Sequence, residues 1–221
     1  QGVLAQSSGR TMEAFDLLRH ARALDPTDPA IAFMLGGNYA QQGMSDRALS
    51  LLEEAYGADS TNLTYARALS AGYIEAGRMQ DALHINERLS EADPEDDDVR
   101  YRLIQLYART GELKKGIQLA TELQKRFQPM PEAYGQLTKM KIQLLALSKD
   151  SVAVGREYRA WAALYPEDRR PYYDWILHLF QTGGAKEAEK QLASDVRAGR
   201  ISLGDATALR VHKYILQKDY P

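Results

Sequence analysis

A pattern with a fixed period of 34 residues runs through the middle of this 221-residue chain. Three positions recur at that spacing: Tyr39, Tyr73 and Tyr107; Gly43, Gly77 and Gly111; and Ala48, Ala82 and Gly116. A period in this range is typical of arrays in which one supersecondary unit repeats, because a single unit cannot bury its apolar face without its neighbours. The chain is therefore predicted to be a stack of similar units.

Each unit has the pattern of two helices joined by a turn. In the copy that begins at Pro29, Leu35 and Tyr39 share one helical face, Gly43 marks a turn, and a second apolar stripe follows. Ala48 falls where the second helix would cross the first, so a larger side chain there would hold the two backbones apart. Prolines fall at the junctions between units, where they interrupt no helix. The pattern predicts an all-α fold of helix hairpins.

When the repeated positions are aligned along the chain, they predict a single array over 1–221 that is divided into seven segments. These are a partial repeat at 1–28, regular repeats at 29–62, 63–96 and 97–130, a repeat at 131–168 with a four-residue insertion, a repeat at 169–202, and a last segment at 203–221. The last segment either caps the array or begins a further repeat.

The charge is small overall but unevenly distributed. The formal net charge of −2 gives no general attraction to nucleic acid or anionic membranes. Residues 1–98 carry 7 Lys and Arg against 17 Asp and Glu, whereas residues 99–221 carry 21 against 13. No apolar run approaches the ~18 residues that suggest a spanning helix. We expect no nucleic-acid partner and no membrane insertion by this chain.

Sequence signals for catalysis and metal binding are missing. The chain has no cysteine, no Gly-rich phosphate loop, no Gly-x-Ser-x-Gly elbow and no His-Glu-x-x-His pair. The four histidines, His20, His84, His178 and His212, fall in different repeats and at different register positions. The sequence therefore predicts no catalytic residue, no cofactor and no metal site, and a protein that is not an enzyme.

The repeated residues also carry a family resemblance. Leu35, Gly36, Tyr39, Gly43 and Ala48, with Leu52 and Ala55, resemble the pattern of the tetratricopeptide repeat (TPR) family. The resemblance implies a right-handed superhelical solenoid of antiparallel helix hairpins, whose first helices line a concave groove that binds peptides or partner proteins. In the fifth repeat Lys141 stands where that pattern has a tyrosine. The first repeat also resembles long bacterial envelope-associated or secreted TPR proteins, which favours the periplasm or cell envelope.

The candidate partner-binding residues lie on the first helices, on the side that turns to the groove when the apolar stripe is buried. They are Phe33, Arg67, Tyr101, Arg102, Gln105, Arg109, Gln136, Lys139, Tyr173 and Asp174. Aromatic and cationic side chains suit peptide carboxylates and backbone amides. The alternative for each residue is a solvated helix face.

The repeated tyrosines are expected in the core, where they fill the space between helices. Trp161 and Trp175 are expected to meet across one repeat boundary as hydrophobic core, with an exposed docking patch as the alternative.

The sequence predicts a non-catalytic protein-protein interaction scaffold that binds a peptide or partner protein on its concave face. One alternative is a structural or self-associating module, in which the acidic half of one copy meets the basic half of another in a salt-sensitive way. A further alternative is a regulatory or targeting array for a catalytic domain that lies outside this chain.

Overall fold

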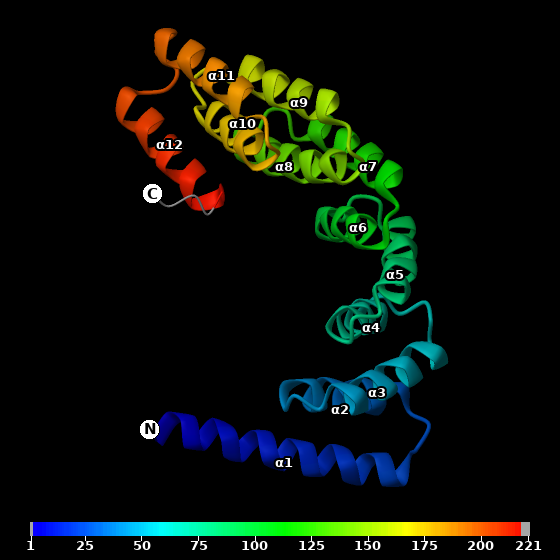
Figure 1. The fold of residues 1–221 in the computed structure, drawn as a ribbon. Coiled ribbons are helices and arrows are strands. Elements are labelled where there is room, and N and C mark those ends of the chain that lie inside the picture. The colour runs from blue at the N-terminus through cyan, green and yellow to red at the C-terminus, as the bar shows by residue number, and fades with distance from the viewer. Residues whose placement is uncertain (1, 218–221) are drawn as a thin grey trace. The chain divides into compact units, whose positions relative to one another are not determined.

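A computed structural model describes the backbone of residues 2–217 and the side chains of residues 13–213, and this part of the chain folds into helices only (Figure 1). The helices are α1 Gly2–Leu24, α2 Pro29–Gln41, α3 Ser45–Ala58, α4 Leu63–Glu75, α5 Met79–Ala92, α6 Asp97–Thr110, α7 Leu113–Arg126, α8 Pro131–Leu147, α9 Ser151–Leu164, α10 Arg170–Gln181, α11 Ala185–Arg197 and α12 Leu203–Gln217. None of these helices is both long and apolar enough to cross a membrane.

The chain forms two compact units, Gln1–Gly116 and Ile117–Pro221, and each is described by itself. In the first unit α2 packs on α3 and α4 packs on α5. In the second unit α8 packs on α9, α10 packs on α11, and α12 packs on α10 (Figure 1). Successive helices therefore form the hairpins that the 34-residue period predicts.

Helices α2 and α4 each begin at a side chain that accepts hydrogen bonds. Oδ1 of Asp28 accepts from the backbone N–H of Ala30 at 2.7 Å, and Pro29 occupies the first helical position of α2. Oδ1 of Asn62 accepts from Thr64 N–H at 3.0 Å at the start of α4. Both side chains satisfy backbone donors that have no partner within the helix. Local sequence thus determines where these helices start.

The turns inside the hairpins share one backbone conformation. The glycines with a positive φ in these turns are Gly43 (74°), Gly77 (73°), Gly111 (83°) and Gly183 (83°). In the fifth repeat Lys149 takes the place of this glycine, with φ 61°. The turn is closed by the Asp150 N–H, which donates a hydrogen bond to the Leu145 carbonyl at 3.0 Å. A residue with a Cβ is strained there, because its Cβ crowds the following carbonyl oxygen.

Replacing Lys149 by glycine is therefore expected to raise the free energy of unfolding by about 1 kcal/mol, since glycine adopts this conformation without that clash. Urea unfolding followed by circular dichroism measures the change. Lys149→Ala is the matched control, because it removes the charged side chain but keeps the Cβ, and it should leave the stability unchanged. A Lys149→Gly variant that is less stable than wild type would contradict the prediction.

The core of the first unit lies between its hairpins. Leu52, Leu69 and Leu89 are buried in one cluster with Val99. Ala48 is almost completely buried, as its crossing position requires. The small residue at the crossing lets the two helices approach, and the leucines then close the space between repeats.

The three repeated tyrosines are not equally buried. Tyr107 is buried, in agreement with the sequence prediction, whereas Tyr39 and Tyr73 are only half-buried. Burial and a hydrogen bond to Glu87 raise the pKa of Tyr107 to about 12. A basic side chain lies over each ring, with centroid distances of 5.7 Å for Arg47 over Tyr39, 4.4 Å for Arg78 over Tyr73 and 5.5 Å for Lys115 over Tyr107. Each of these cation–π contacts adds an attraction between the tyrosine ring and a basic side chain.

Two apolar clusters lie among the described residues of the second unit. Trp161 is fully buried in the cluster between α8 and α9, and half-buried Trp175 packs against that cluster from α10. The two tryptophans therefore belong to one cluster that joins neighbouring hairpins, as the sequence predicts, although Trp175 keeps an exposed part. The other cluster, between α10, α11 and α12, contains Ile176, Phe180 and Leu192.

The fifth repeat differs from the regular repeats in its first helix. Helix α8 has 17 residues, whereas α2 and α4 have 13 each. Lys141 is buried in the middle of α8, where its Nζ atom lies 2.8 Å from Oε1 of Glu157 and 3.1 Å from Oε1 of Gln124. Gln124 also donates to Oγ1 of Thr138 at 2.8 Å. A buried polar network thus replaces the tyrosine of the three regular repeats.

Candidate functional site

A hollow of about 470 Å³ opens between the first helices α8 and α10 of the second unit. Its polar rim is formed by exposed or half-buried side chains: Lys139, Gln143, Asp174, Gln181 and Thr182. Its apolar floor is formed by Ile142, Tyr158 and Leu177. We call this hollow the α8/α10 groove.

An ion pair crosses the α8/α10 groove. Nζ of Lys139 on α8 lies 2.9 Å from Oδ2 of Asp174 on α10, with both side chains still partly exposed. The same ammonium lies 5.9 Å from the centroid of the Trp161 ring. Because exposed ion pairs stabilise folds only weakly, this pair is expected to contribute little to the stability of the second unit.

The floor of the α8/α10 groove contains aromatic and titratable side chains. His178 stacks on Trp175, with ring centroids 5.8 Å apart and the rings 14° from parallel. Burial lowers the pKa of His178, so its imidazole is neutral at pH 7. Burial and the Asp174 carboxylate raise the pKa of Tyr158, so its hydroxyl stays protonated. The floor is therefore uncharged, and only the rim carries charge.

A smaller hollow of about 210 Å³ lies between α10 and α12 and shares Leu177 with the α8/α10 groove. The hydroxyl of Tyr173 donates to Oδ2 of Asp205 at 2.6 Å across it. Ser202 also donates to that carboxylate, at 2.6 Å, and Asp205 N–H donates back to the serine oxygen at 3.1 Å. Bonds from Ser202 and Tyr173 lower the pKa of Asp205. The shared leucine makes the two hollows neighbours along α10.

The first unit presents a separate polar face on α4 and α6. Arg67 on α4 pairs with Asp96, which caps α6 through the Val99 N–H. The hydrogen bond from the Val99 N–H lowers the pKa of Asp96. Burial raises this pKa by less, and Arg67 lowers it further. The ion pair between Arg67 and Asp96 thus links α4 to the start of α6.

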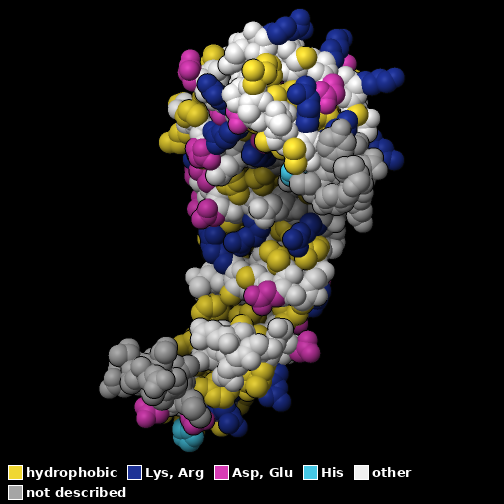
Figure 2. Space-filling model, turned by 60° about the vertical axis from the view of Figure 1, so that its left-hand side comes forward, with side chains coloured by type: hydrophobic (Ala, Val, Ile, Leu, Met, Phe, Trp, Pro, Cys, Tyr) yellow, Lys and Arg dark blue, Asp and Glu magenta, His cyan; other side chains and the backbone are white. Residues whose placement is uncertain are grey.

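The remaining candidates in the first unit lie on α6. Tyr101 is half-buried, and burial together with Asp97 raises its pKa. Within the described residues Arg102 makes no hydrogen bond or ion pair, and Gln105 and Arg109 are exposed. Figure 2 shows Lys or Arg side chains beside hydrophobic ones on the face that it draws.

Two sequence candidates lie outside these surfaces. Phe33 is half-buried and packs on Tyr65, with ring centroids 5.1 Å apart, so it mainly joins α2 to α4. Gln136 is exposed on α8 but does not line the groove. Six of the ten candidates belong to the first unit and four to the second.

The sequence reasoning missed the apolar floor of the groove. Leu177 and His178 follow Asp174 by three and four residues, which places them on the same side of α10. That spacing was the signal that could have found them. Among the described residues no cluster of three His, Asp or Glu side chains could hold a metal ion.

Repeated helix pairs, most of them joined by a turn that contains a positive-φ glycine, define an α-helical repeat protein. The family model described as "Tetratricopeptide repeat" matches residues 5–72 and 73–139. Since these ranges make up more than half of the chain, the chain belongs to the tetratricopeptide repeat family. No curated protein matches the sequence.

Solved structures show the same fold. A tetratricopeptide repeat protein from Parabacteroides merdae ATCC 43184 is 18% identical, with a TM-score of 0.63 over 96% of this chain and 82% of that chain. YrrB, described as a TPR protein with an unusual peptide-binding site, is 16% identical, with a TM-score of 0.60 over 74% and 82%. The structure of Naa15/Naa10 bound to HypK-THB gives 16% identity and a TM-score of 0.69 over 96% of this chain and 32% of that chain. At these identities the likeness shows the fold alone.

Proposed function

We propose that this chain is a non-catalytic protein-interaction scaffold, and that its second unit binds a peptide segment in the α8/α10 groove. The main support for this proposal is the composition of the groove: an uncharged, partly aromatic floor lies below a rim that carries both a positive and a negative side chain. The groove lies between helices of two different repeats. A peptide side chain would lie on Leu177 and Ile142, and the carboxamides of Gln143 and Gln181 would bind the peptide backbone. Such pockets, apolar below and polar at the rim, are typical of ligand sites.

The family supports this proposal without establishing it. YrrB, which shares the fold, is described as having a peptide-binding site. The neighbouring hollow with Tyr173 and Asp205 extends the proposed surface along α10 towards α12. We propose that α6, with Arg102, Gln105 and Arg109, also takes part in partner binding.

The test uses a displayed library of random peptides with the whole chain as bait, followed by calorimetric titration of one selected peptide. The double variant Gln143→Arg/Gln181→Arg fills the rim with long side chains and is expected to weaken binding at least about tenfold, since the ligand loses its backbone partners and the floor is covered. Both glutamines are exposed, so the melting temperature should not change.

The matched control is Ala160→Arg, an exposed position on α9 that does not line the groove. It should leave the affinity unchanged. Equal affinity of the groove variant and wild type would refute the α8/α10 groove as the site. An Arg102→Glu variant in the same titration tests the α6 face, and unchanged affinity for every selected peptide would remove that face from the proposal.

A further inference from the structure

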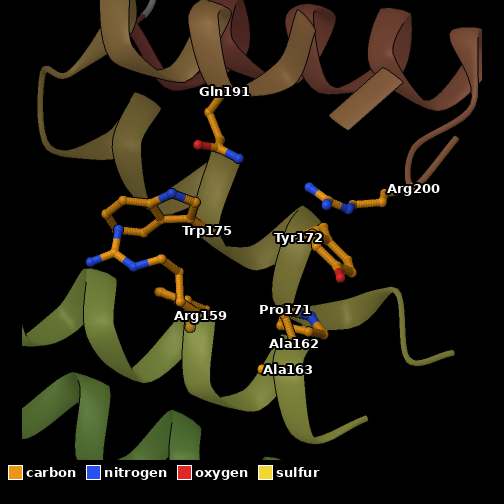
Figure 3. Close-up of a pocket in the computed structure, with 9 residues that line it drawn as sticks. Arg159, Ala162, Ala163, Pro171, Tyr172, Trp175, Gln191 and Arg200 are labelled. Carbon is orange, nitrogen blue, oxygen red and sulfur yellow. The ribbon is translucent and has the colours of Figure 1, made fainter. Parts of the chain in front are cut away.

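The second unit has another pocket, which lies on a different side of α10 from the α8/α10 groove. It has a volume of about 290 Å³ and is bounded by α9, by α10, by Gln191 of α11 and by Arg200 in the turn after α11 (Figure 3). Trp175 and Tyr172 of α10 line it between two arginines, Arg159 and Arg200. We call it the two-arginine pocket.

The lining of the two-arginine pocket carries positive charge only, although Asp195 behind it pairs with Arg200. All the residues that line it are described, and none of them is acidic. Arg159 is exposed and, within the described part of the chain, has no ion-pair or hydrogen-bond partner. The pocket therefore favours a negatively charged ligand over a neutral one.

A buried carboxylate fixes the second arginine. The side chain of Asp195 is 1% exposed, and its Oδ1 atom accepts a hydrogen bond from Nη1 of Arg200 at 3.0 Å. Its Oδ2 atom accepts from Nε2 of Gln191, also at 3.0 Å. A guanidinium has five N–H donors, so Arg200 retains donors that Asp195 does not use. Asp195 acts as a positioning residue that holds Arg200 and Gln191 at the pocket.

Aromatic surface lies next to these donors. The guanidinium of Arg200 lies 5.5 Å from the centroid of the Tyr172 ring. Figure 3 shows Arg159 reaching Trp175 from α9, Gln191 approaching from α11, and Arg200 entering from the other end beside Tyr172. The pocket thus offers both cationic donors and flat apolar surface to one ligand.

We propose that the two-arginine pocket binds an acidic segment of a partner protein, in which a glutamate or aspartate carboxylate lies beside an aromatic side chain. The carboxylate lies between Arg159 and Arg200, because charge-assisted hydrogen bonds from guanidinium groups are stronger than neutral ones. The neighbouring ring of the ligand packs on Trp175. This site shares Tyr158 with the α8/α10 groove but would take a different ligand.

The test uses the whole ¹⁵N-labelled chain and two synthetic peptides, acetyl-Gly-Glu-Phe-Glu-Gly-amide and its neutral counterpart acetyl-Gly-Gln-Phe-Gln-Gly-amide, at low salt. The chain has two tryptophans, so two indole N–H signals are expected, and Trp175→Phe assigns them. The acidic peptide is expected to shift the Trp175 signal in a saturable way, and the neutral peptide is expected to bind about tenfold more weakly or not at all.

Variants then assign the binding to the pocket. Arg159→Gln and Arg200→Gln are each expected to raise the Kd of the acidic peptide about tenfold. Lys190→Gln is the matched control, since it removes an exposed cation from α11 that does not line the pocket. The groove variant Gln143→Arg/Gln181→Arg should keep the affinity, which separates this proposal from the proposed function.

Three results would overturn the proposal: equal shifts by the two peptides, an equal loss of affinity in Lys190→Gln, or an unchanged Trp175 signal. A Trp175 signal that moves with protein concentration alone would assign the pocket to a second copy of the chain and overturn it too. If Arg200→Gln fails to fold because Asp195 loses its partner, Arg159→Gln decides the outcome, because Arg159 has no partner in the described fold to lose.

Discussion

Replacing Trp161 by alanine is expected to lower the free energy of unfolding by about 3–5 kcal/mol, the range for a large buried aromatic side chain. Trp161 is fully buried between α8 and α9. A Cβ added at Gly135 would lie 2.7 Å from Cζ2 of Trp161, which shows how closely α8 packs on the ring. The indole N–H also donates to Oδ2 of Asp168 at 3.1 Å. The alanine variant therefore loses both apolar packing and a hydrogen bond.

Urea unfolding followed by circular dichroism measures this loss. Leu147→Ala is the control, because Leu147 is exposed near the end of the neighbouring helix α8. It should change the stability by less than about 0.5 kcal/mol. A loss below about 1 kcal/mol for Trp161→Ala would mean that the site is less tightly packed than the structure indicates.

Replacing Glu157 by alanine is expected to cost about 3 kcal/mol, because it leaves the buried ammonium of Lys141 without its counter-ion. The side chains of Lys141 and Glu157 are 10% and 19% exposed. After the substitution Gln124 would supply the remaining acceptor to the ammonium. A single amide oxygen does not compensate for the loss of hydration and of the carboxylate.

The origin of this loss is tested by a second substitution. Lys141→Met removes the buried charge with little change in length, so the double variant Glu157→Ala/Lys141→Met should recover at least half of the lost stability. The four proteins of this cycle are compared in the same urea unfolding experiment. A double variant no more stable than Glu157→Ala alone would show that lost packing, rather than an unpaired charge, causes the effect.

The outcome of these experiments bears on the proposed sites as well as on the fold. Trp161 lies under the Lys139 ammonium, and Tyr158 of the same cluster lines both the α8/α10 groove and the two-arginine pocket. A variant that loosens this cluster is therefore expected to weaken both sites together. The exposed variants at Gln143, Gln181 and Arg159 avoid that difficulty.

Much of the fold could be predicted from the sequence, because its signals are local. Recurrent Gly43, Gly77 and Gly111 adopt the left-handed conformation that the hairpin turn requires, and Asp28 caps α2 directly. The 34-residue period then places each apolar stripe against the next. The turns and caps depend on residues a few positions apart, and the period is a regular pattern along the chain.

The candidate site could be predicted only in part. The sequence predicts Lys139 and Asp174 as two groove residues, but it does not predict that their side chains form an ion pair. Phe33 was placed in the groove by register, whereas it packs mainly on Tyr65. Register gives the side of a helix on which a residue lies, but it does not say which neighbour its side chain contacts.

The sequence by itself determined the helix hairpins and the family, since both follow from the repeated 34-residue pattern and from turn chemistry. Only the tertiary structure decided that Lys141 finds its counter-ion in Glu157 and that Arg159 and Arg200 face one pocket. The members of these sets come from different helices, and no repeated residue marks them. Their association depends on how neighbouring helices pack, because packing brings together side chains that are far apart in the sequence.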